Sequence, residues 1–112
     1  MKEICREWEG VEPCGAMVDL LVGMDVGRLS EEQKVTAYIL ARKIGAFASA
    51  VELEVLNGVE DVTEVAMAAR EPERAVGRQK EFSGVVEALP RMVRQLRRGE
   101  IDLRRLEVVY YW

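Results

Sequence analysis

The residues best suited to chemistry in this sequence are arginines that recur at helical spacing in its second half. Arg74 and Arg78 are four residues apart, and Arg91, Arg94 and Arg98 follow at intervals of three and four. On a helix such intervals place side chains on one face. Guanidinium groups bind phosphate oxygens and guanine edges through charge-assisted hydrogen bonds. The spacing predicts a nucleic-acid-binding surface; its ordinary alternative is a solvated helix face.

The distribution of charge points the same way. The chain has a net charge of −4, but residues 1–69 contain 6 basic and 13 acidic residues, whereas residues 70–112 contain 10 basic and 7 acidic. Any contact with a polyanion should therefore use the C-terminal half. We expect the arginines there to form one cationic surface, framed by a pair of helices.

Several kinds of active site are excluded by residues that the chain lacks. It has no histidine, which removes Ser-His-Asp and Cys-His triads and histidine-based zinc sites. No glycine-rich phosphate loop occurs, and the paired acids Glu52/Glu54 and Glu60/Asp61 would point to different sides of a helix. We expect no catalytic residue, no cofactor and no small-molecule substrate.

The two cysteines and the lack of long apolar runs indicate in which cellular compartment the protein is expected. Cys5 and Cys14 are the only cysteines, so a disulfide between them is the alternative to free thiols. A metal site is less favoured, because no histidine or further cysteine occurs to complete a tetrahedral set. We expect free thiols and no metal. No run approaches the roughly 18 apolar residues that span a bilayer, and the first residues lack a signal-peptide core. These features favour a cytoplasmic protein without a membrane segment.

The elements that must position the arginines are all predicted to be helical. The 112 residues fit one domain, in which residues 1–29 form a lead-in with a short helix and residues 30–112 form the main helical part. We predict an all-α fold of five to six helices with one long central helix. The predicted helices cover residues 15–24, 31–56, 64–70, 73–89, 91–98 and 103 onward.

Several helix ends carry recognisable capping residues. Ser30 and Gln33 form a capping box at the start of the long helix. Asp61 or Thr63, and later Asp102, are suited to begin helices, while Gly23 and Gly99 are suited to end them in the left-handed conformation. The end at residues 107–112 favours strand by composition, but we prefer a continued helix.

The long helix carries two apolar stripes. Its predicted core face consists of Leu40, Ile44, Phe47, Val51 and Val55. A second stripe of small residues consists of Ala37, Ala41, Gly45 and Ala48. Small side chains let another helix approach closely. That helix belongs either to the same chain, which we favour, or to a second copy across a homodimer seam.

Residues 63–78 have the spacing of small and apolar residues that is typical of a helix-turn-helix. Ala66 provides a small side chain where the second helix crosses the first, and Ala69 and Val76 are expected to hold the two together. The outward positions of the second helix are Glu73, Arg74, Gly77, Arg78 and Glu81. The turn departs from the usual pattern, because Arg70 stands where glycine is common. The alternative is two ordinary core helices joined by a tight turn.

The second half also resembles a known family. Four segments carry this resemblance, and they are Val62-Thr63-Glu64-Val65-Ala66, Pro72-Glu73-Arg74-Ala75, Leu89-Pro90 and Leu96 to Asp102. These segments are similar to the actinobacterial domain-of-unknown-function family number 222, the 13E12-repeat proteins. The resemblance covers about residues 30–109. It implies a helical domain that accompanies an HNH endonuclease domain in phage-related and mobile-element proteins, with catalysis outside this chain.

Two functions follow from these patterns. The first is a non-catalytic module that binds or positions DNA through Arg74, Arg78, Arg91, Arg94 and Arg98. The second is a protein-interaction or homodimerisation module that uses the small-residue stripe.

Overall fold

The computed structural model describes residues 3–112, and over that range every regular element is a helix. The all-α prediction is therefore confirmed. Two 3-10 helices and seven α-helices follow one another in the order η1 (Arg6–Gly10), α1 (Gly15–Val22), η2 (Val26–Arg28), α2 (Glu31–Gly58), α3 (Val62–Ala69), α4 (Glu73–Phe82), α5 (Val85–Ala88), α6 (Pro90–Arg97) and α7 (Leu103–Tyr111). The last helix is α-helical to Tyr111, as preferred over a strand.

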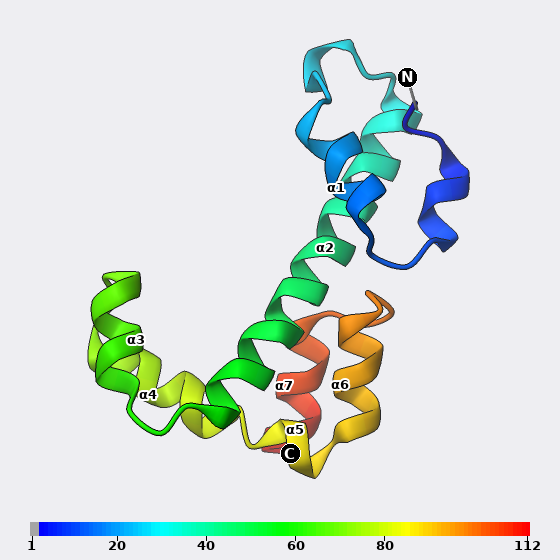
Figure 1. The fold of residues 1–112 in the computed structure, drawn as a ribbon. Helices are drawn as coiled ribbons and strands as arrows, with labels where there is room; N and C mark the ends of the chain where they lie inside the picture. The colour runs from blue at the N-terminus through cyan, green and yellow to red at the C-terminus, as the bar shows by residue number, and fades with distance from the viewer. Residues whose placement is uncertain (1–2) are drawn as a thin grey trace.

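Helix α2 is the axis of the molecule (Figure 1). It begins with the predicted capping box, in which the Gln33 N–H donates to Ser30 Oγ at 3.2 Å and the Ser30 N–H donates to Gln33 Oε1 at 2.9 Å. Its 28 residues correspond to about 42 Å of helix. The whole molecule measures 44 × 30 × 20 Å, so α2 runs through nearly its full length. The other elements are arranged along this rod.

The two halves of α2 bury different faces. The N-terminal half buries Thr36, Ala37 and Leu40 near η1 and α1, whereas the C-terminal half buries Ala46, Ala50, Leu53 and Leu56. Leu40 and Ala46 are six residues apart, which is about 240° around a helix. The predicted single core face is thus wrong beyond Leu40: Ile44, Phe47 and Val51 are only half-buried, and Val55 is 58% exposed.

The main core lies beside the C-terminal half of α2. It consists of Ala46, Ala50, Leu53, Phe82, Val85, Val93, Leu96 and Leu106. Tyr110 meets the ring of Phe82 edge-on at a centroid distance of 5.5 Å, and Tyr111 stacks on it at 5.7 Å. This core joins α2, α4, α5, α6 and α7 and fixes the outward faces of α6 and α7.

One predicted helix is divided in two. The sequence predicts a single helix over residues 73–89, but α4 ends at Phe82 and the short α5 begins at Val85. At the break, the hydroxyl of the buried Ser83 donates to the backbone carbonyl of Lys80, a bond that competes with helix continuation. The change of direction lets both Phe82 and Val85 enter the main core.

The helix ends test the capping predictions individually. Asp61 and Asp102 accept the N–H groups of Thr63 and Arg105, both at 2.9 Å, and so begin α3 and α7 as expected. Gly99 follows α6 with a φ of +74°, the predicted left-handed conformation. The prediction for Gly23 is wrong, because its φ of −85° is right-handed.

Candidate nucleic-acid interface

Helices α3 and α4 form the predicted pair around a three-residue turn. Arg70 ends α3 in the left-handed conformation, with φ 56° and ψ 42°, and the N–H of Glu71 donates to the carbonyl of Ala66 at 3.0 Å. This is the Schellman arrangement that usually uses glycine. Across the turn, Thr63 Oγ1 donates to the Glu73 carboxylate at 2.8 Å. The turn has the three-residue length and the left-handed residue that are common in a helix-turn-helix, although a cationic residue occupies the glycine position.

A small separate core holds this pair to the end of α2. Ala66 and Val76 are 4% and 1% exposed and cluster with Leu56. Their predicted roles at the helix crossing are confirmed. Ala69, which was expected to join them, is exposed. The pair therefore rests on few apolar contacts and projects from one end of the molecule (Figure 1).

The outward face of α4 carries both signs of charge. Arg74 and Arg78 are exposed as predicted, and so are Glu73 and Glu81, while Gly77 is half-buried. Arg78 also lines a hollow of about 250 Å³ whose rim includes the acidic residues Glu52 and Glu107. Two carboxylates share this face with the two arginines, so its attraction for phosphate is weaker than the arginine spacing suggests.

Helix α6 presents a more uniform cationic face. Arg91, Arg94 and Arg98 are exposed along one side, whereas Val93 and Leu96 on the opposite side are buried in the main core. No acidic residue occurs between Pro90 and Arg98. Burial of one side fixes the rotation of the helix, so these three guanidinium groups necessarily face solvent together. Among residues 3–112, neither Arg91 nor Arg94 takes part in an ion pair.

Arg97, by contrast, is turned inward onto α2. Its Nη1 donates to Glu54 Oε2 at 2.8 Å, and its guanidinium carbon lies 5.4 Å from the centroid of the Phe47 ring. The ion pair and the cation–π contact attach α6 to α2. Sequence spacing gave no sign of this role, because Glu54 is 43 residues distant.

The two arginine groups lie on different helices, one on α4 and the other on α6. Helix α6 packs against the C-terminal half of α2 in the main core, whereas α3 and the first turns of α4 pack against Leu56. In Figure 1, α6 lies along one side of the C-terminal half of α2, and the α3–α4 pair projects from the end of α2 on the other side. Arg74 and Arg78 form one group, and Arg91, Arg94 and Arg98 another.

The small-residue stripe of α2 is also divided. Ala37 is buried within the chain at 5% exposure, but Ala41, Gly45 and Ala48 are exposed. A Cβ atom on Gly45 would have no described neighbour within 4 Å. The favoured prediction, packing within the same chain, is correct for Ala37 and wrong for the other three.

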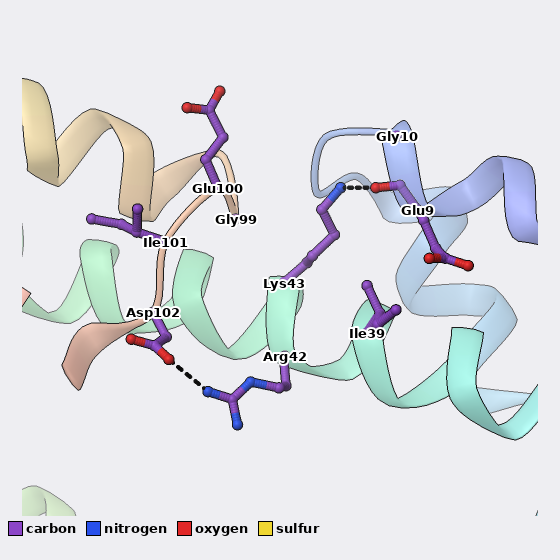
Figure 2. Close-up of a pocket in the computed structure, with 9 residues that line it drawn as sticks. All are labelled: Glu9, Gly10, Ile39, Arg42, Lys43, Gly99, Glu100, Ile101 and Asp102. Atoms are coloured by element: carbon purple, nitrogen blue, oxygen red, sulfur yellow. Dashed lines mark hydrogen bonds and ion pairs between the residues drawn. The ribbon is translucent and has the colours of Figure 1, made fainter. Parts of the chain in front are cut away.

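A hollow of about 620 Å³ lies where η1, α2 and the α6–α7 loop meet (Figure 2). Lys43 Nζ donates to the backbone carbonyls of Glu9 and Val11, both at 2.7 Å, and Arg42 Nη2 donates to Asp102 Oδ2 at 2.8 Å. The pKa of Asp102 is lowered, first by the backbone N–H of Arg105 and then by the charge of Arg42. The charged groups in this hollow connect segments of the chain to one another.

No acidic or cysteine cluster within residues 3–112 is suited to hold a metal ion, and Cys5 and Cys14 are free and exposed. No helix in the described part of the chain combines the length and the apolar character that crossing a membrane requires. Comparison with known proteins found no matching family model, curated protein or solved structure.

Proposed function

We propose that this chain is a non-catalytic helical module that binds duplex DNA. The observation that carries the proposal is the outward face of α6, where three exposed arginines lie opposite two buried apolar residues. A face of this kind contacts the phosphate backbone and needs no particular base sequence. The α3–α4 pair supplies a second contact, in which Arg74 and Arg78 reach base edges or phosphates.

The wider context of this proposal comes from the residue pattern described above. The resemblance to the 13E12-repeat proteins suggests that the module positions DNA for an HNH-type nuclease of a phage-related or mobile-element protein. In that arrangement this chain supplies affinity and orientation, and a separate domain supplies the catalysis.

The proposal is tested by fluorescence anisotropy with a short labelled DNA duplex over a range of salt concentrations. Each phosphate contact contributes about 0.9 to the slope of log K against log salt concentration, so replacing Arg91, Arg94 and Arg98 by alanine should flatten that slope by about 2.7. The double variant of Arg74 and Arg78 should weaken binding to a smaller extent.

The matched control is Arg28→Ala, because Arg28 is an exposed arginine in η2 that pairs with Asp25 and lies outside both arginine groups. It should leave the slope unchanged. If the wild-type chain does not bind duplex DNA at about 50 mM salt, the proposed function is wrong.

A second candidate function is homodimerisation through α2. The exposure of Ala41, Gly45 and Ala48 favours it, because nothing in residues 3–112 covers these small residues. A Cβ atom at Gly45 has no described neighbour within 4 Å, so we expect the monomer to accommodate Gly45→Glu. If light scattering finds a dimer, Gly45→Glu and Ala41→Glu should convert it to a monomer, whereas Glu52→Gln should not.

A further inference from the structure

An acidic loop lies against the C-terminal end of α6. Oε1 of Glu12 is 3.8 Å from Nε of Arg98, and the two side chains are 71% and 55% exposed. Arg98 belongs to the arginine face of α6. The N-terminal segment therefore places a carboxylate beside one of the three guanidinium groups to which we assign phosphate binding.

The position of this loop is fixed by its backbone. Lys43 Nζ donates to the backbone carbonyl of Glu9 (Figure 2) and to that of Val11, and both residues precede Glu12. Thr36 Oγ1 donates to the Glu9 carboxylate at 2.9 Å. The stem of Lys43 also lies against Gly99, the residue that follows Arg98. One lysine thus contacts both the loop that carries Glu12 and the turn after Arg98, which brings the two charges together.

We propose that Glu12 is an intramolecular competitor of DNA phosphate for Arg98, so that the N-terminal segment restrains polyanion binding by α6. This inference rests on the proposed function. Carboxylate and phosphate oxygens accept the same hydrogen bonds from a guanidinium group. Residues 3–12 contain four acids and one base, so the segment carries the charge of a weak phosphate mimic. Because the ion pair is exposed, a polyanion can displace it.

The test compares two single-charge changes in the same segment. Glu12→Gln should tighten duplex binding about two- to fivefold at about 50 mM salt, which is the range expected when an exposed ion pair no longer competes. Glu7→Gln is the matched control, since it makes the same change of charge at an exposed residue of η1 without an ion pair to α6 among the described residues. It should have a distinctly smaller effect.

A double-variant cycle separates direct competition from general charge. With Arg98 replaced by alanine, the effect of Glu12→Gln should fall to that of Glu7→Gln. Equal effects of the two glutamate variants, or an undiminished Glu12→Gln effect without Arg98, overturn the inference while leaving DNA binding intact. Absence of binding by wild type and all variants overturns both the inference and the proposed function.

Discussion

The backbone of Gly99 lies directly against the side chain of Lys43. A Cβ atom added to Gly99 would come within 2.9 Å of the Cβ and 3.1 Å of the Cα of Lys43. This contact brings the turn after α6 onto α2, beside the residue that anchors the N-terminal loop. The turn and α2 can approach this closely because Gly99 has no side chain.

Gly99→Ala should therefore destabilise the fold. Alanine at a φ of +74° is strained, and its methyl group meets α2, so the free energy of unfolding should fall by about 1–3 kcal/mol in urea titration. Gly45→Ala is the control, because it lies in open space within α2 and should stabilise by up to about 1 kcal/mol. A tolerated Gly99→Ala would show that the turn does not depend on this contact.

Ala66 should be intolerant of larger side chains. It is 4% exposed where α4 crosses α3, so Ala66→Leu should force the pair apart and cost about 1–3 kcal/mol, measured by urea unfolding. Ala69→Leu, three residues further along α3, changes an exposed position and should be nearly neutral. Equal losses from the two variants would mean that α3 uses a different face.

Replacing Arg70 with glycine should raise the stability of the fold by a small amount. Its left-handed backbone costs about 1–2 kcal/mol relative to a right-handed one, part of which glycine recovers. Arg70→Gly should raise the free energy of unfolding by about 0.5–1 kcal/mol, whereas the β-branched variant Arg70→Val should lower it. Thermal unfolding of the two variants in parallel tests whether each variant is more or less stable than wild type. Destabilisation by glycine would contradict this conformation.

The carboxylate of Asp102 should make the free energy of unfolding depend on pH in the acidic range. Its pKa is lowered in the folded state, mainly because it accepts the N–H of Arg105 and also because Arg42 is close. The stabilisation is therefore present above its unfolded pKa of about 3.9 and is lost as the pH falls through the lower folded value. Asp102→Asn keeps an acceptor at the helix start but cannot titrate. It should be less stable than wild type at neutral pH and lose less stability on acidification below about pH 4.

The features that could be predicted from the sequence are those decided within a few residues. The Ser30 capping box and the caps at Asp102 and Gly99 depend on side chains and backbone groups three or four positions apart. Such interactions are visible in the sequence because their partners are adjacent in it. Val76 and Ala66 were also identified, since helix pairing across a short turn is nearly local.

The features that sequence analysis missed depend on partners far along the chain. Val55 looked like a core residue because periodicity assumes one buried face, but α2 packs against different elements along its length. The role of Arg97 could not be predicted, because its partners Glu54 and Phe47 lie more than 40 residues earlier in the chain. No sequence pattern indicated that Lys43 holds the N-terminal loop, because its acceptors are backbone carbonyls, which are the same in every residue type.

The separate core of the α3–α4 pair has a consequence for how the molecule opens. Leu56, Ala66 and Val76, with Val62 and Val65 beside them, attach α3 and the first turns of α4, whereas Phe82 anchors the end of α4 in the main core. Amide hydrogens in α3 and in the first turns of α4 should therefore exchange with solvent well before those of α6, through a local opening that leaves the long helix intact. A partner that orders this hairpin would slow that exchange selectively.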